Sequence, residues 1–235
     1  MNVAIVVAAG KGTRLGGNRP KQFLELDGIP VIIHTLRQFE RSTEINEVVI
    51  VLPAPLTAES AESFLSFARA FGLSKPRQAV AGGSTRAQSV HRGLVAIAGA
   101  DVVAVHDGVR PFVTPEEINQ AVIAARENGA AVLVAPVNDT IKEIKGDRVV
   151  RTLRRAQLRR ALTPQCFRFE ILKRAYDQLA EVEAEGIEVT DDCLLVERLG
   201  VEIVTVEGSA RNIKITREED LALAQALLKE ASFVL

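Results

Sequence analysis

The sequence is poor in the residues on which disulfide frameworks and metal centres depend. Its 235 residues include no tryptophan, one tyrosine, three histidines and two cysteines. Cys166 and Cys193 lack the spacing of metal ligands and have no histidine partner nearby. A disulfide or a catalytic thiol stays open as an alternative, but two such isolated residues favour reduced, partly buried thiols in a cytosolic protein.

Net charge and long apolar runs are also scarce. The formal net charge is -1, so we expect no nucleic-acid partner and no attraction to an anionic membrane. No apolar run reaches the roughly 18 residues that a membrane helix needs. The apolar N-terminus has no basic leader, which favours a strand over a signal peptide. With 47% hydrophobic and 25% charged residues, the chain reads as one cytoplasmic globular domain over residues 1–235.

Short β-branched runs alternate with helix-length amphipathic stretches. The expected strands are 3–8, 47–52, 77–80, 102–106, 131–135 and 202–207. The expected helices are 31–41, 58–71, 85–98, 115–128, 170–185, 191–199 and 217–229. Capping boxes are expected where Thr114 and Thr216 are followed three residues later by glutamate. Because the strand candidates are apolar throughout, the alternation predicts an α/β fold with a doubly wound, mostly parallel sheet.

Residues 137–155 interrupt this alternation and resemble a β-hairpin, with a turn at Lys145-Gly146-Asp147-Arg148. The segment is basic on an otherwise neutral protein. Two interpretations stay open from the local pattern. It is either a solvated surface ribbon or an arm that reaches another subunit or an anionic ligand.

A strand followed by a glycine-rich loop opens the chain, with Gly10, Gly12, Arg14 and Lys21 in and just beyond the loop. The loop matches neither the Walker pattern nor the dinucleotide fingerprint, because Leu15 stands where the latter needs glycine. Glycines let backbone N–H groups approach a phosphate, and cations neutralise its charge. The stretch therefore predicts a nucleoside triphosphate site.

Two further motifs support a ligand site. Gly82-Gly83-Ser84-Thr85-Arg86 precedes a helix and offers free N–H groups, although a helix start alone explains it equally well. Asp107 follows a buried strand, where open α/β sheets bind ligands, and is placed to hold Mg²⁺. The alternative for Asp107 is a residue that simply caps its loop. None of the three histidines is a candidate acid or base, since His34 and His91 fall in helices without a recognisable carboxylate partner.

Ala8-Ala9-Gly10-Lys-Gly12-Thr-Arg14, followed by Pro20-Lys21-Gln22, resembles the signature of nucleotidyltransferases that activate sugars and polyol phosphates. Within them the chain is most similar to the 2-C-methyl-D-erythritol 4-phosphate cytidylyltransferase family, from the first strand to Asn212-Ile-Lys214. The resemblance implies a Rossmann-like sheet of the nucleotide-diphospho-sugar transferase type. It also implies Mg²⁺-dependent transfer of CMP from CTP to a polyol phosphate, with release of pyrophosphate. A protruding β-arm at about 137–155 would cross to the other subunit of a homodimer.

The resemblance assigns roles to particular residues. Those implied as catalytic are Arg14, Lys21 and Lys214, the last in a short apolar strand. Those implied to bind the nucleotide are Ala8, Ala9, Gly10, Gly12, Gly83, Ser84, Ser89 and Asp107, with Asp107 also binding the metal. Those implied to bind the acceptor are Arg110, Thr140, Arg155, Thr163, Thr190 and Asp191.

The chain departs from the family in two places. Gly108 and Val109 stand where the family commonly has alanines, and Arg154 replaces an aspartate just before Arg155. Val109 matches a sister enzyme, ribitol-5-phosphate cytidylyltransferase, which is the alternative function. A non-catalytic nucleotide-binding or dimer-forming module is the alternative from another class, since fold alone does not fix function. Four charges gathered for one site argue against such a module.

Overall fold

A seven-stranded sheet forms the centre of the computed structural model, which describes residues 1–10 and 20–232. The strand order is β11-β7-β10-β6-β1-β4-β5, and all neighbours except those of β10 pair in parallel. The strands are β1 (Asn2–Val7), β4 (Glu47–Leu52), β5 (Pro76–Ala81), β6 (Val102–Asp107), β7 (Ala130–Pro136), β10 (Arg159–Arg168) and β11 (Val204–Glu207). The predicted doubly wound, mostly parallel sheet is confirmed.

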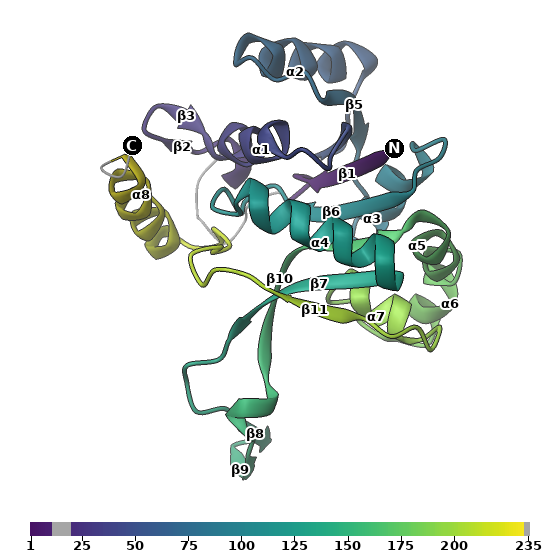
Figure 1. Ribbon diagram of the computed structural model, residues 1–235, viewed down its shortest axis with the longest axis vertical. Helices are drawn as coiled ribbons and strands as arrows, with labels where there is room; N and C mark the ends of the chain where they lie inside the picture. Colours follow the sequence, from purple (N-terminus) through teal and green to yellow (C-terminus); the bar gives the residue numbers. More distant parts are fainter. Residues whose placement is uncertain (11–19, 233–235) are drawn as a thin grey trace.

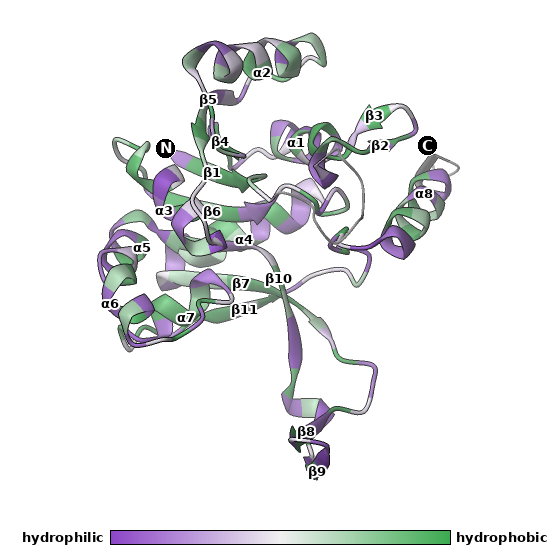
Figure 2. Ribbon diagram, turned by 180° about the vertical axis from the view of Figure 1, so that it is seen from behind, coloured by the Kyte–Doolittle hydropathy of each residue, from purple (hydrophilic) through white to green (hydrophobic). Residues whose placement is uncertain are grey.

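Helices cover both faces of this sheet (Figure 1). The helices on one face are α1 (Val31–Arg41), α2 (Ala58–Ala70) and α4 (Pro115–Asn128). Those on the other are α3 (Arg86–Val95), α5 (Phe169–Tyr176), α6 (Leu179–Ala184) and α7 (Asp192–Glu197). Successive residues of β1 enter opposite layers, with Ala4 packing on the first face and Ile5 on the second. This two-sided burial explains the continuous apolar strands, which are green in Figure 2.

The last helix, α8 (Glu218–Ser232), packs on a small separate cluster that includes Leu26 and Val109. Its predicted capping box is wrong, because the Asp220 carboxylate, and not Glu219, accepts from the Thr216 backbone and hydroxyl. The capping box of α4 is confirmed, with Thr114 and Glu117 bonded reciprocally. No helix in the described residues is long and apolar enough to cross a membrane.

The structure corrects two predictions of secondary structure, a helix that is divided and a strand that was not expected. The expected helix 170–185 divides into α5 and α6, because the chain turns after Tyr176 and both pieces can then bury apolar residues in one cluster. Strand β10 was not predicted, since it starts with two arginines and contains Pro164. Its irregular register against β7, between Ala161 and Gln165, accommodates the proline.

The segment 137–155, which we call the arm, contains the predicted hairpin of β8 (Lys142–Lys145) and β9 (Arg148–Thr152). Gly146 closes the turn with φ of 61°, a conformation that favours glycine. The arm projects away from the sheet (Figure 1), and every residue of both strands is exposed. Short elements complete the fold, namely η2 (Lys21–Phe23), β2 (Glu25–Leu26), β3 (Ile29–Pro30) and η3 (Arg155–Gln157).

Candidate active site

The candidate site lies where β1 and β6 end side by side. Val7 and Asp107 are paired in the sheet, so the loop after β1 and the carboxylate that ends β6 meet at one edge. The chain runs from β1 towards β4 and β5 on one side and continues with β6 on the other. Ligands of open α/β sheets bind at such a switch point. A cavity is present there, lined by Ala8, Ala9, Gly10, Lys21, Gln22, Gly83, Ser84, Arg86, Ser89, Arg92, Asp107, Val109 and Lys214 among others.

Gln22 fixes the loop after β1. Its buried amide donates to the Ala8 carbonyl at 2.6 Å, which explains why the Pro-Lys-Gln motif follows the glycine loop. The adjacent Lys21 lines the cavity, and its side chain passes beside Gly10. The sequence therefore brings the predicted residues Ala8, Ala9, Gly10 and Lys21 together. Gly12 and Arg14 lie outside the described residues.

The second wall is the loop between β5 and α3. Gly82 has no room for a side chain, because a Cβ atom there would lie 2.2 Å from that of Ala9. This close approach joins the second glycine motif to the first. Thr85 then caps α3 by accepting from the Gln88 backbone N–H at 3.1 Å.

The predicted nucleotide-binding serines lie in the cavity wall and hold this loop. The Ser89 hydroxyl accepts from the Gly83 N–H at 3.1 Å and donates to the Thr85 carbonyl at 2.9 Å. The Ser84 hydroxyl donates to the Gln88 side chain at 2.7 Å. These bonds set the shape of the wall that a ligand would meet.

Asp107 is the electrostatic centre of the site. One carboxylate oxygen accepts from Arg86 Nε at 3.2 Å, and the other lies 3.2 Å from Arg110 Nε and 3.0 Å from Lys214 Nζ. Burial alone would raise the pKa of Asp107, but the neighbouring cations outweigh it and hold that pKa well below its usual range. Arg86 also pairs with Asp192, so three cations face two carboxylates, and the surplus of positive charge suits a phosphate-rich ligand.

Lys214 reaches the site from a loop, so its predicted place in a strand is wrong. Its neighbours Ile213 and Ile215 are apolar because they pack against the cluster under α8, which mimics a strand pattern. The Ile215 N–H donates to the Val109 carbonyl at 3.0 Å and thereby anchors the loop beside Asp107. The predicted convergence of Lys214 with Asp107 and Lys21 on one cavity is present.

His106 and Thr163 support Asp107 from behind. The Thr163 hydroxyl donates to His106 Nδ1 at 3.0 Å and accepts from the Asp107 N–H at 3.2 Å. His106 Nε2–H donates to the Arg110 carbonyl at 3.2 Å. Burial lowers the pKa of His106 to about 4, so the ring is neutral and cannot act as a base at neutral pH. Thr163 was predicted to bind the acceptor, and in this structure its hydroxyl makes these two hydrogen bonds within the protein.

Thr190 and Asp191 lie on the far side of Arg86. A neighbouring cavity is lined by Arg86, Gln88, Glu183, Glu188 and Thr190, among others. Asp191 caps α7 by accepting from the Leu194 N–H at 3.1 Å, and it also accepts from the Gln165 amide at 2.8 Å. Of the two predicted acceptor residues, Thr190 therefore lines a cavity and Asp191 orders the helix behind it.

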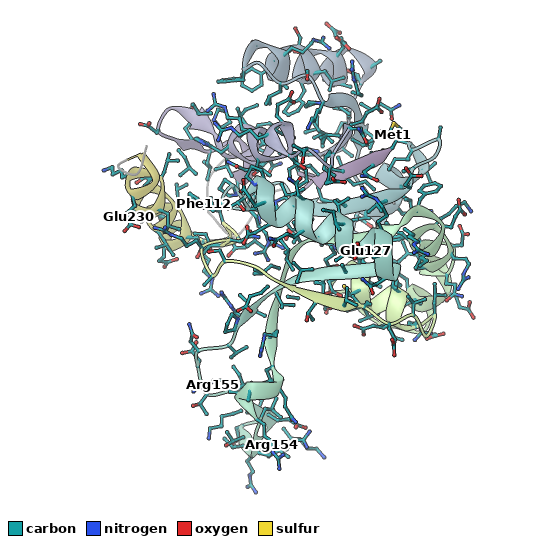
Figure 3. The ribbon with its side chains drawn as sticks, in the orientation of Figure 1. Met1, Phe112, Glu127, Arg154, Arg155 and Glu230 are labelled. Carbon is teal, nitrogen blue, oxygen red and sulfur yellow. The ribbon has the colours of Figure 1, made fainter. Side chains whose placement is uncertain are left out.

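Thr140 and Arg155 are not brought to this site within one chain. Both are exposed, and Figure 3 shows Arg154 and Arg155 on the arm, remote from the sheet. The Arg155 guanidinium donates to the Asn138 carbonyl at 2.7 Å, which ties the two sides of the arm together.

Sequence reasoning missed Arg86, Asp192, Gln165 and Tyr176. Arg86 is the first residue of α3, where the helix dipole disfavours a cation, so a nearby acidic partner could have been expected. Gln165 accepts from the Asp192 and Cys193 N–H groups at 2.9 and 3.2 Å and holds the start of α7. No local signal marks the other residues, because their partners lie far away in the sequence.

The acidic groups around the cavity are few. In the described part of the chain, no cluster of three or more His, Cys, Asp or Glu side chains could hold a metal ion. Asp107 is the one acidic side chain among the described residues that line the cavity. Mg²⁺ commonly uses one or two carboxylates together with substrate phosphates. The ionised Asp107 fits that pattern only when phosphate oxygens complete the coordination.

The sheet, the cavity at its switch point and the converging cations define a nucleotidyltransferase of the doubly wound α/β class. A family model described as 2-C-methyl-D-erythritol 4-phosphate cytidylyltransferase (IspD) matches residues 2–230. The chain belongs to this family.

Individual relatives and a solved structure agree with this family assignment. A 2-C-methyl-D-erythritol 4-phosphate cytidylyltransferase of Bacillus velezensis is 43% identical over 231 residues, covering 98% of this chain and 97% of the relative. Its counterpart in Alkaliphilus metalliredigens is 44% identical over 230 residues, covering 96% and 92%. The crystal structure of 4-diphosphocytidyl-2C-methyl-D-erythritol synthase from Anaerococcus prevotii superposes with a TM-score of 0.83 at 31% identity, covering 97% and 96% of the two chains.

Proposed function

We propose that this protein transfers the CMP group of CTP to 2-C-methyl-D-erythritol 4-phosphate. The products are 4-CDP-2-C-methyl-D-erythritol and pyrophosphate, in the synthesis of isoprenoid precursors. The observation that carries the proposal is the Asp107 cluster, in which Arg86, Arg110 and Lys214 converge beside the glycine loop. The identity of the nucleotide, CTP, and of the acceptor is inferred from membership of the family.

The acceptor phosphate acts as the nucleophile. A phosphate monoester has its second pKa near about 6, so it is largely dianionic at pH 7 and needs no general base. The neutral, buried His106 agrees with this requirement. One acceptor oxygen attacks the α-phosphorus in line with the departing pyrophosphate, so a P–O bond forms as the α–β bridge breaks.

Catalysis then rests on positioning and charge. Lys21 and Lys214 line the cavity and neutralise the transition state, and Arg14 would join them from the glycine loop. Asp107 keeps Lys214 and Arg110 in place before CTP binds. The wall formed by Gly83, Ser84 and Ser89 surrounds the base and ribose of the nucleotide.

We propose Mg²⁺ as the cofactor, held by Asp107 and by phosphate oxygens of CTP. When bound, it would offset the negative charge of the triphosphate. Asp107 is suited to this task because the neighbouring cations keep it ionised.

We also propose a homodimer in which the arm of one subunit completes the site of the other. The arm buries neither face of its strands, and Ile144, Val149 and Val150 are 56% to 65% exposed. Thr140 and Arg155 of the partner's arm would bind the acceptor phosphate beside Arg110 and Thr190. Arg155→Ala should raise the acceptor KM. Arg154→Ala is its matched control, because the adjacent arginine carries the same charge.

We propose that the enzyme works in the cytoplasm. Cys166 and Cys193 are free and buried, and burial raises the pKa of both thiols well above the usual value. Such thiols stay protonated and unreactive at neutral pH, as suits a reducing compartment.

Ribitol 5-phosphate is the competing acceptor. Val109 matches that sister family, but the family model and the curated relatives favour methylerythritol phosphate. Pyrophosphate release should be measured with CTP, Mg²⁺ and each acceptor in turn, with the Lys21→Ala variant as the blank. We expect turnover with methylerythritol phosphate, and turnover with ribitol phosphate alone would overturn the assignment.

A further inference from the structure

Arg86 joins two buried carboxylates that come from distant parts of the chain. Its Nε donates to Asp107 Oδ1 at 3.2 Å, and its Nη2 donates to Asp192 Oδ2 at 2.8 Å. The side chains of Arg86, Asp107 and Asp192 are 21%, 8% and 0% exposed. Charges this well buried interact strongly, and neither carboxylate is simply solvated.

The two carboxylates belong to different halves of the site. Asp107 lies in the nucleotide cavity, whereas Asp192 begins α7, directly after Thr190 and Asp191. Arg86 itself lines both the nucleotide cavity and the neighbouring cavity that includes Thr190. Its side chain is thus the shared wall between them.

The pair with Asp192 matters more to α7 than to the nucleotide cavity. Asp107 has two other cations, Arg110 and Lys214, within 3.2 Å. Within the described residues, Arg86 is the one cation paired with Asp192, whose second oxygen accepts from the Tyr176 hydroxyl at 2.5 Å. If Arg86 no longer paired with it, Asp192 would be a buried charge held by a single neutral donor.

We propose that Arg86 is a positioning residue that sets the place of the acceptor-binding segment, at Thr190 and Asp191, relative to Asp107. The guanidinium fork allows this because it offers two donors at a fixed spacing, which a lysine cannot. The nucleotide half and the acceptor half are thereby held in register before either substrate binds. This inference rests on the acceptor role that the proposed function gives to Thr190.

The test separates acceptor binding from CTP binding. In Asp192→Asn the shape of the side chain is kept and the charge that Arg86 holds is lost. We expect the acceptor KM to rise about tenfold, because the acceptor segment is displaced. The Kd for CTP, measured by calorimetry, should change less than about threefold, since Arg86 stays on Asp107.

Two further variants make the result specific. Tyr176→Phe removes the other hydrogen bond of Asp192 but keeps its ion pair, so the acceptor KM should stay within about threefold. Arg86→Lys should raise both the acceptor KM and the Kd for CTP. Adding Asp192→Asn to Arg86→Lys should then change the acceptor KM little further, because the link is already broken. The melting temperature of each variant shows whether the fold is kept.

An equal effect of Asp192→Asn and Tyr176→Phe on the acceptor KM would overturn the proposal, as it would indicate packing alone. Additive effects of Arg86→Lys and Asp192→Asn would do the same. Wild-type turnover with methylerythritol phosphate is measured first. Its absence would count against the proposed function, whereas the ratios between variants bear on Arg86 alone.

Discussion

Two regions of this protein are rich in cations. In the first the cations are paired and largely shielded from solvent, and in the second they are exposed. Around Asp107, the side chains of Arg110, Arg86 and Lys214 are 12%, 21% and 37% exposed and share one carboxylate. The arm carries six Lys or Arg residues against three Asp or Glu residues, all of them exposed. Its end is coloured mainly hydrophilic in Figure 2.

The two regions differ in how far their charged side chains are ordered before a ligand or partner binds. The cluster at Asp107 is ordered in advance, since buried charges keep fixed partners. The cations of the arm are exposed, so their contacts within the arm, such as Arg151 with Glu143, are weakened by solvent and fix them little. On the proposed function, the first region would hold its charges for the transfer of CMP, and the second would present them to the partner subunit.

The largest expected effect comes from removing the central charge. Asp107→Asn leaves three cations without their shared anion, so the free energy of unfolding should fall by about 3 kcal/mol. Asp147→Asn in the arm is the control and should change it by less than about 0.5 kcal/mol. Urea unfolding measures both, and equal losses would remove the contrast between the regions.

Lys21→Ala tests whether the cations that line the cavity act in the transition state. Turnover should fall about 100- to 1,000-fold, because a positioned charge at the departing pyrophosphate is lost. Lys145→Ala, at the tip of the arm, removes the same charge and should change turnover less than about threefold. Steady-state pyrophosphate release compares them, and unchanged turnover in Lys21→Ala would rule out its assigned role.

A pH series tests the buried support of Asp107. His106 has a pKa of about 4 in the folded protein, below the usual 6.5, so the unfolded chain binds more protons between these values. Stability is therefore lost as pH falls, by about 1.5 kcal/mol between pH 6.5 and 5. His106→Asn keeps an uncharged polar group there and should flatten this slope in urea unfolding. The contribution of Asp107 is lost only below its usual pKa of 3.8, so the two windows are separate. An unchanged slope would contradict the assignment to His106.

The smallest effect is expected in the arm. Arg151 pairs with Glu143, but their side chains are 68% and 44% exposed. Arg151→Ala should change the free energy of unfolding by less than about 0.5 kcal/mol. A loss above about 1 kcal/mol in denaturant titrations would mean that the arm is more ordered than its exposure indicates.

The sequence was sufficient for those features that local pattern encodes. Strands buried on both faces are apolar throughout, so β1, β4 and β6 were predicted, and the motifs at their ends located the cavity. Strand β10 was missed because Pro164 and its polar start hide a strand whose pairing is non-local.

The rest of the site depends on contacts over long sequence distances. Arg86 forms ion pairs with carboxylates that are 21 and 106 residues away in the sequence, and no rule of residue spacing predicts such pairs. Lys214 lines the predicted cavity, but the strand predicted around it is a loop, since the apolar residues beside it pack against the cluster under α8. The acceptor role of Thr163 stays a prediction, whereas the hydrogen bonds of its buried hydroxyl to His106 and Asp107 had no signal in the sequence.

Mixed dimers test most directly the claim that one subunit's sheet and its partner's arm make a single site. With the acceptor well below the KM that Arg155→Ala raises, Lys21→Ala and Arg155→Ala chains each turn over slowly. Their statistical mixture should regain about a quarter of wild-type activity, because half the dimers hold one intact site. Wild-type chains mixed with the double variant serve as the control and should gain nothing from mixed dimers. Verified mixed dimers of the two single variants without any recovered activity would contradict the account.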